Sequence, residues 1–324
     1  MKKVAVLGGT RYVGRRVVDR LLDDEVEVTL VTRGLTPDPF GDAVIRRTAD
    51  VASTQALRNA LTREDGELFD VVLHQVAYHP SHARALLAAT EGRARRLVVT
   101  STIEVYNPES LRSAPPAVAR ATSSPHTEAS VDLTGYPIAA DAPWDEPTYL
   151  EKHYGEGKRQ VEALVLGAAI PSATVRLAHV LAPDDPTGRL RTLTDHVRSR
   201  TPVAVHHHPG ATSFVHADQA AAALIEIMRD DVTGPINLAA PDPTDTLQLL
   251  AAIGAVTGIE PVLDTRSDAD VAEHASPFTY RSDFAMDTGR LRSLVADLSP
   301  VAAWLPDTLA TFLTERSSSC STSS

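Results

Sequence analysis

Apolar and polar positions follow a repeating order along the first half of the chain. A short apolar run at 4–7 leads into glycines and then into a helical pattern ending near Leu22. Later apolar runs lack polar alternation, which indicates strands buried on both faces. Further strands are expected at 26–31, 43–47, 69–73, 96–100 and 173–177, with helices between them near 54–61, 81–90 and 149–166.

This alternation predicts an α/β fold, a doubly wound and mostly parallel Rossmann sheet whose ligand crevice lies at the carboxyl ends of the strands. Helical patterns at 189–200, 219–228 and 248–257 extend the second half. We assign residues 1–178 plus about 209–240 to a dinucleotide-binding domain, and about 179–208 plus 241–316 to a smaller C-terminal substrate lobe. The Ser-rich tail at 317–324 offers little to bury and is expected to be disordered.

One segment, 107–147, breaks the pattern and is rich in Ser, Ala, Pro and Thr. Loops of this length inside a domain are usually functional or disordered. An active-site lid is the favoured interpretation, and an inert surface loop is the alternative.

Composition narrows the class of protein. The 324 residues carry a net charge of −11, with an isoelectric point of about 5.5, which disfavours nucleic acid and anionic membrane surfaces as partners. Cys320 is the single cysteine, and the three consecutive side chains of 206–208 diverge, so no metal site is expected. No apolar run reaches membrane-spanning length and no signal-peptide pattern is present, so we expect a soluble cytoplasmic protein.

The first candidate site is a glycine motif between the first strand and the first helix. A turn there leaves backbone N–H groups at a helix N-terminus, where the helix dipole favours a diphosphate. The first glycine permits a tight turn, and the last lets the helix approach the strand. A dinucleotide site is favoured over a merely structural turn. The motif is Gly8-Gly9-Thr10-Arg11-Tyr12-Val13-Gly14.

Two further clusters carry hydroxyl groups. Tyr154 and Lys158 are four residues apart, so a helix places them on one face, where the ammonium group would lower the pKa of the phenol and allow proton exchange at neutral pH. Taken alone, this pair is more typical of a solvated helix face. Thr102, with Ser101 beside it, ends the expected fifth strand and could bond the same substrate oxygen.

In this order and spacing, the three clusters resemble the extended short-chain dehydrogenase/reductase superfamily, the NAD(P)-dependent epimerase/dehydratase family, in a divergent branch with a Gly-Gly-Thr-Arg motif. The resemblance covers roughly residues 1–240. It implies that Tyr154 exchanges the proton, that Lys158 tunes it and holds the nicotinamide ribose, and that Thr102 orients the substrate. Tyr149 is a rival tyrosine, but its fourth neighbour is His153.

The resemblance also implies cofactor contacts further along. Where the family carries an acidic residue for the ribose 2′-hydroxyl, this chain has Thr32 and Arg33, and Arg11 replaces the middle glycine. Two guanidinium groups suit a 2′-phosphate. We therefore predict NADP(H) in preference to NAD(H). Other expected contacts are Asp50 and Val51 with the adenine, and Gln75, Val76 and Ala77 with the ribose.

Departures from the family bear on the substrate. Ile103-Glu104 replaces the Asp-Glu pair of the dehydratases, which disfavours sugar 4,6-dehydration. Thr212 stands where the family carries an arginine that binds the diphosphate of nucleotide sugars, which disfavours a nucleotide-sugar substrate, although Arg176 or Arg189 could substitute for that arginine. The candidate substrate contacts are Ser101, Glu104, His79, Arg176 and His179.

The leading functional hypothesis is an NADP(H)-dependent oxidoreductase, of the ketoreductase or alcohol dehydrogenase type, acting on a small-metabolite carbonyl or secondary alcohol. One alternative is a sugar or nucleotide-sugar epimerase that uses bound NAD(P) transiently. Another is a non-catalytic NADP- or RNA-binding protein. The resemblance also leaves a homodimer open.

Overall fold

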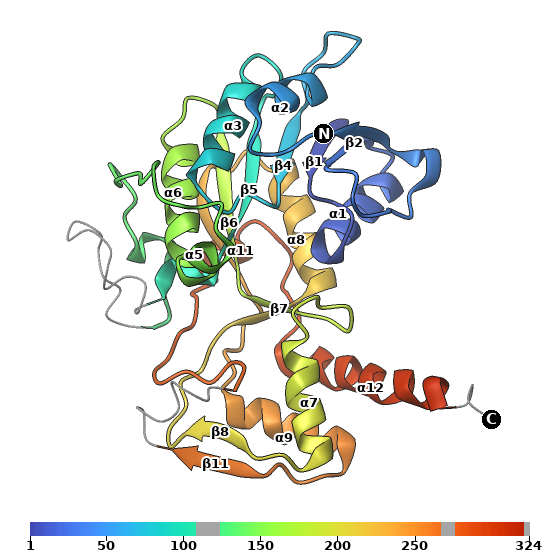
Figure 1. The fold of residues 1–324 in the computed structure, drawn as a ribbon, viewed down its shortest axis with the longest axis vertical. Helices are drawn as coiled ribbons and strands as arrows, with labels where there is room; N and C mark the ends of the chain where they lie inside the picture. The colour runs from blue at the N-terminus through green and yellow to red at the C-terminus, as the bar shows by residue number, and fades with distance from the viewer. Residues whose placement is uncertain (108–123, 267–275, 321–324) are drawn as a thin grey trace.

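The computed structural model describes residues 1–107, 124–266 and 276–320 (Figure 1). Strands and helices alternate through most of the chain, as the apolar pattern predicts. Its elements are β1 (Lys3–Leu7), α1 (Tyr12–Asp23), β2 (Glu27–Thr32), η1 (Gly41–Ala43), β3 (Ile45–Thr48), α2 (Thr54–Ala60), β4 (Val71–His74), α3 (Pro80–Thr90), β5 (Leu97–Thr102), η2 (Ile103–Tyr106), η3 (Glu128–Ser130), α5 (Pro147–Lys152), α6 (Tyr154–Leu166), β6 (Ser172–Leu177), β7 (His179–Leu181), α7 (Arg189–Ser199), β8 (Val203–His206), β9 (Phe214–His216), α8 (Ala217–Arg229), β10 (Gly234–Leu238), α9 (Thr246–Thr257), β11 (Leu263–Arg266), α11 (Gly289–Arg292) and α12 (Val301–Cys320).

A seven-stranded sheet in the order β10-β6-β5-β4-β1-β2-β3 forms the centre of the molecule, and every neighbouring pair in it is parallel. Helices cover both faces. Val4 and Val6 of β1 share a core with α1 and α8, whereas Ala5 and Leu7 share one with α2, α3 and α6. Both sets of side chains are fully buried, which explains why the strands read as uninterrupted apolar runs. The predicted doubly wound fold is confirmed.

A separate hydrophobic core lies beyond the carboxyl ends of the strands, in the lower part of Figure 1. It is built by α7, α9 and α12, together with the small parallel pair β8 and β11. A second small pair, β7 and β9, joins this region to the main sheet. The chain runs between this region and the main sheet more than once, so that separate segments from the second half of the sequence together build this core.

Three predicted elements differ from the observed ones. The helix expected over 149–166 is two helices, α5 and α6, separated at His153. The third strand is β3 at Ile45–Thr48 rather than 43–47. Helix α12 continues to Cys320, so 317–320, which composition assigned to a disordered tail, extend a helix, while 321–324 lie outside the described residues.

The described part of the predicted lid, 124–147, is fastened to the molecule. The hydroxyl of Tyr136 donates to Glu156 of α6 at 2.6 Å, and the amide N–H of Ala139 donates to the side chain of Gln160 at 2.9 Å. Trp144 is buried against Gly157. This part therefore packs as a fixed layer beside α6, while 108–123 lie outside the described residues.

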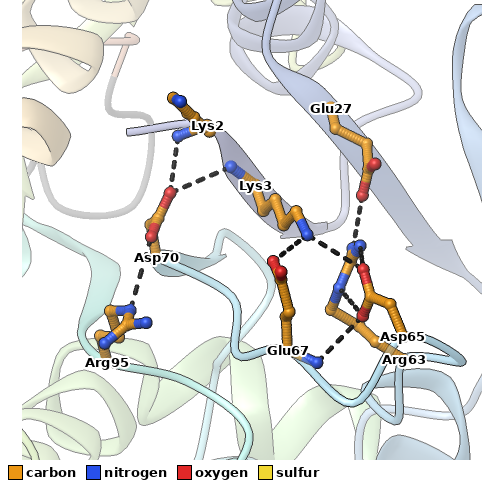
Figure 2. Close-up of polar contacts among 8 residues, drawn as sticks. All are labelled: Lys2, Lys3, Glu27, Arg63, Asp65, Glu67, Asp70 and Arg95. Atoms are coloured by element: carbon orange, nitrogen blue, oxygen red, sulfur yellow. Dashed lines mark hydrogen bonds and ion pairs between the residues drawn. The ribbon is translucent and has the colours of Figure 1, made fainter.

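Charged side chains gather at the amino ends of the strands (Figure 2). The ammonium of Lys3 pairs with Asp65 at 2.9 Å and with Glu67, while Asp70 accepts from the backbone N–H of Lys3 at 3.1 Å. Arg63 links Asp65 to the second strand. Because these groups face solvent, the pairs contribute little to stability. They lie at the edge of the sheet opposite the crevice.

None of the described helices combines the length and the hydropathy that crossing a membrane requires.

Candidate active site

The glycine motif forms a tight turn at the carboxyl end of β1. Gly8 has φ of +88°, in the left-handed region that favours glycine, and its N–H donates to the carbonyl of Val31 at 3.2 Å. A Cβ on Gly14 would lie 2.4 Å from the carbonyl oxygen of Gly8. Helix α1 can therefore approach the strand only with glycine at that position, as the motif predicts.

A cavity of about 310 Å³ opens beside this turn. It is walled by the carboxyl ends of β1, β2, β3 and β4, the edge where parallel sheets bind ligands. Seven of the predicted cofactor residues line it: Gly8, Thr10, Thr32, Arg33, Asp50, Val51 and Val76. Its wall also contains residues that the sequence analysis missed: Val31, Leu35, Thr36, Ala49, Tyr78 and His82. Leu35 is 76% exposed, an uncommon state for leucine at the mouth of a cavity.

The remaining predicted cofactor residues support the turn. Gly9, Val13 and Ala77 are packed among apolar side chains. Arg11 is exposed at the N-cap of α1 and does not line the cavity, so of the two arginines expected at a 2′-phosphate only Arg33 is placed there.

Two buried polar atoms beside the turn test whether the site fits a dinucleotide. The hydroxyl of Tyr12 and the amide nitrogen of Gln75 have no hydrogen-bond partner among the described residues. Tyr12 also holds φ of 50°, a conformation that costs free energy for a residue with a Cβ. Unpaired polar groups and local strain at a glycine turn are features of a binding site. The residues present fit a dinucleotide.

The three predicted catalytic side chains come together at the end of β5. Tyr154 is the first residue of α6, and its hydroxyl hydrogen-bonds the side chain of Thr102, the last residue of β5. The ammonium of Lys158 lies 5.8 Å from the ring centre of Tyr154 and donates to the carbonyl of Thr100 at 3.0 Å. Lys158 is buried and Tyr154 is half-buried, so the pair lies on a face of α6 that packs against the protein rather than on a solvated one.

Burial is the largest influence on the pKa values of Tyr154 and Lys158. It raises the pKa of Tyr154, an effect that the hydrogen bond from Thr102 opposes. Burial also lowers the pKa of Lys158 to about 7, with Glu162 acting in the other direction. The expected lowering of the phenol's pKa by the lysine is therefore outweighed by desolvation.

A close backbone approach fixes the position of Lys158. A Cβ on Gly157 would lie 2.4 Å from the carbonyl oxygen of Tyr78, so α6 and the segment after β4 touch with no side chain between them. The ammonium of Lys158 consequently lies 4.9 Å from the ring centre of Tyr78. The glycines flanking Glu156 in the sequence were a signal of this contact that the sequence analysis did not use.

Two predicted substrate contacts belong instead to the interior. Ser101 donates to Glu162, and Arg176 forms an ion pair with the same carboxylate at 2.8 Å, with both charged side chains essentially inaccessible to solvent. Arg176 also donates to the hydroxyl of Tyr106 at 2.6 Å. Because their polar atoms are engaged beneath the sheet edge, the prediction that Ser101 and Arg176 contact substrate is not supported by their positions.

The other substrate candidates lie nearer the crevice. Glu104 accepts from Asn107 at 2.7 Å, and its charge acts on Tyr154. His179 is buried, and its Nε2 is 2.8 Å from the hydroxyl of Tyr280. Burial lowers the pKa of His179 to about 3, which keeps the ring neutral. Tyr280, which the sequence analysis missed, is thus the group that His179 positions.

His79 caps α3 and is buried beneath an aromatic layer. Its ring is nearly parallel to that of Trp144, with centres 6.2 Å apart, and lies 3.8 Å from the ring of His82. Its Nδ1 has no partner among the residues that the structure describes. His79 therefore packs against His82, which lines the cavity, but does not line the cavity itself. Its contact with substrate stays a prediction.

Comparison with known families decides the assignment. The model of the NAD dependent epimerase/dehydratase family matches residues 4–239. The chain belongs to this family. The match ends just past β10, so it includes the sheet, the glycine turn and the Tyr154 cluster. Comparison with curated proteins gives no significant match.

Solved structures of the epimerase/dehydratase type share the whole fold. A UDP-glucose 4-epimerase from Stenotrophomonas maltophila, with bound NAD, is 18% identical, with a TM-score of 0.71 over 98% of this chain and 100% of that one. A dTDP-glucose 4,6-dehydratase from Bacillus anthracis is 13% identical, with a TM-score of 0.69 and 97% of both chains covered. A UDP-glucose 4-epimerase from Thermotoga maritima is 16% identical, with a TM-score of 0.67, covering 98% and 99%. At these identities the similarity establishes the fold.

Lys158 provides a first test of this epimerase/dehydratase site. Lys158→Met is expected to be between neutral and about 3 kcal/mol more stable than the unmodified protein at pH 7, because it removes a buried cation, while turnover falls. The folded pKa of about 7 lies below the ordinary 10.5, so the stability of the unmodified protein rises with pH across this window. The advantage of the variant should therefore shrink between pH 7 and 10.

Urea unfolding at several pH values, together with turnover, measures both effects. A variant that is less stable and fully active would assign Lys158 a structural role.

Proposed function

We propose that the protein is an NAD(P)-dependent epimerase of a sugar or nucleotide sugar, the alternative to the reductase that the sequence favoured. The observation that carries the proposal is the contact of Tyr154 with Thr102 above buried Lys158, at the carboxyl edge of the sheet. The solved structures of similar fold also support the proposal, because they include two UDP-glucose 4-epimerases.

The chain's own groups perform the proton chemistry. Thr102 orients the substrate hydroxyl. Tyr154 can accept the proton of that hydroxyl only as a phenolate, a form that the positive charges of Lys158 and of a bound oxidised nicotinamide would favour against the effect of burial, and the carbon is then oxidised to a ketone. A bound nicotinamide would supply the hydride acceptor for this oxidation and the hydride donor for the later reduction. Tyr154 then gives the proton back as the ketone is reduced on its opposite face. Lys158 holds the nicotinamide ribose and supplies positive charge beside the phenol. Substrate and product differ only in configuration, so no cofactor is consumed.

Arg189 is the cation that we propose for an anionic substrate group. It begins α7, and its guanidinium carbon lies 4.8 Å from the ring centre of Phe278. Its charge lowers the pKa of both Tyr154 and Tyr280, so it faces the reaction site. Thr212, in contrast, is fully buried and donates to a backbone carbonyl. The lobe would therefore bind a phosphate through Arg189.

Product analysis tests the function. UDP- and dTDP-sugars are incubated with the protein and catalytic NAD+ or NADP+, and the products are separated by configuration while absorbance at 340 nm is followed. Inversion with no lasting change in absorbance is expected. Stoichiometric consumption of NADPH by a carbonyl compound would restore the reductase hypothesis. Salt-sensitive RNA binding without turnover would favour the non-catalytic alternative.

We also propose a preference for NADP(H), because Arg33 lines the cavity beside Thr32. NADPH should bind at least about tenfold more tightly than NADH, a difference of about 1.4 kcal/mol. In Arg33→Ala the preference should shrink while NADH affinity stays unchanged, which titration calorimetry measures. Arg11→Ala is the matched control, since Arg11 is exposed outside the cavity. Equal affinities in the unmodified protein would contradict the proposal.

A further inference from the structure

His82 lies in the first turn of α3 and lines the same cavity as Arg33 and Asp50. Arg33 follows β2, Asp50 follows β3 and His82 lies near the start of α3, so only the fold brings them to one cavity. The sequence analysis did not single out His82 as a cofactor residue. Its ring is instead half-buried in the wall of the cofactor cavity.

A hydrogen bond fixes which nitrogen of His82 can face a ligand. The backbone N–H of Tyr78 donates to Nδ1 at 3.2 Å, so the neutral ring carries its proton on Nε2. The ring of His79 packs 3.8 Å away and holds the orientation. Nε2 makes no hydrogen bond within the described part of the chain. His82 is thus a preoriented donor with one free position.

The charges around His82 keep its ring neutral in a way that a bound anion would reverse. Burial lowers the pKa of His82 to about 4, and the neighbouring His79, Lys158 and Arg33 act in the same direction. Asp50 opposes them. Two further titratable groups face this ring, His74 at 6.5 Å and Tyr78 at 6.3 Å between ring centres. Burial keeps both neutral, because it lowers the pKa of His74 and raises that of Tyr78. A ligand phosphate would add negative charge among these cations and favour the imidazolium form.

We propose that His82 binds the 2′-phosphate of the adenosine ribose together with Arg33, and that His82 takes up a proton when it does so. The inference rests on the proposed NADP(H) preference. Two donors that line the same cavity would then hold the phosphate: the guanidinium of Arg33, which is always charged, and the imidazole of His82, which becomes charged when the phosphate binds. Affinity for NADP+ should therefore rise as pH falls, whereas NAD+ has a hydroxyl at this position and should not show the effect.

The test compares the affinities for NADP+ and NAD+ between pH 8 and 6, above the isoelectric point of about 5.5. In the unmodified protein the ratio of the two affinities should rise about threefold or more towards pH 6. His82→Gln keeps a neutral donor in the place of Nε2 and should lose this rise. His207→Gln, in an exposed loop, is the matched control and should retain it. The comparison between proteins cancels the titration of the phosphate itself.

Proton uptake by the unmodified protein gives a reading that needs no variant. Heats of NADP+ binding at pH 6 in two buffers with different ionisation enthalpies should reveal a fractional proton taken up, and NAD+ should take up less. The same pH dependence in His82→Gln and in the unmodified protein would overturn the role of His82 and leave Arg33 standing. Equal affinity for both dinucleotides at every pH would overturn the NADP(H) preference and this inference together, while inversion of a sugar with NAD+ would still identify the epimerase.

Discussion

Tyr154→Phe is expected to lower turnover about a hundredfold or more and to leave cofactor affinity nearly unchanged. The substitution removes only the hydroxyl that bonds Thr102 and leaves the ring beside Lys158. General acid–base groups contribute on the order of 10²–10⁴ in rate, and a phenylalanine cannot exchange a proton. Steady-state kinetics with the substrate found by product analysis, and calorimetry with the dinucleotide, give the two quantities.

Tyr149→Phe is the matched control for this result. Tyr149 packs in α5 against Trp144 and His153, one helix before the helix that carries Tyr154 and Lys158. Its turnover should stay within about twofold of that of the unmodified protein. Normal turnover in Tyr154→Phe, or a large loss in Tyr149→Phe, would move proton transfer to another group.

Replacing Arg176 by Met is expected to destabilise the protein by about 3–5 kcal/mol. Its partner Glu162 is fully buried, so the substitution would leave a carboxylate without its counter-charge in the interior. The hydroxyl of Tyr106 would lose the donor at 2.6 Å as well. Urea or thermal unfolding measures the change. Had Arg176 been a substrate contact, as its sequence position suggested, the variant would fold normally and show a raised KM.

Removing both charges separates two contributions to the free energy of unfolding: the penalty for leaving the Glu162 carboxylate unpaired, and the net contribution of the ion pair itself. Glu162→Leu combined with Arg176→Met should recover most of the stability lost in the single variant, because well-packed apolar groups often replace a buried ion pair at little cost. Arg229→Ala, which breaks an exposed pair with Asp24, should change stability by less than about 1 kcal/mol. A double variant as unstable as the single one would mean that shape, not charge, holds this region together.

The apolar pattern by itself determined the sheet and the order of its helices. Val4 to Leu7 are all buried because helices cover both faces, and this leaves a local signature that needs no knowledge of distant residues. The glycine turn and the Tyr154–Lys158 pair could also be predicted from the sequence, because each depends on spacing within a single turn or helix. Segment 124–147 gave no such signature, because its fastening depends on partners in α6.

Tertiary structure alone decided which polar residues face the cavity. Ser101 and Glu162 are 61 residues apart in sequence, and only the packing of α6 on the sheet turns Arg176 inward to meet them. The same packing, through Gly157, buries Lys158 and lowers its pKa. His82 enters the cavity wall because α3 starts just after the carboxyl end of β4, one of the strand ends that wall the cavity. Desolvation and long-range pairing arise from the assembled fold, so no pattern of neighbouring residues encodes them.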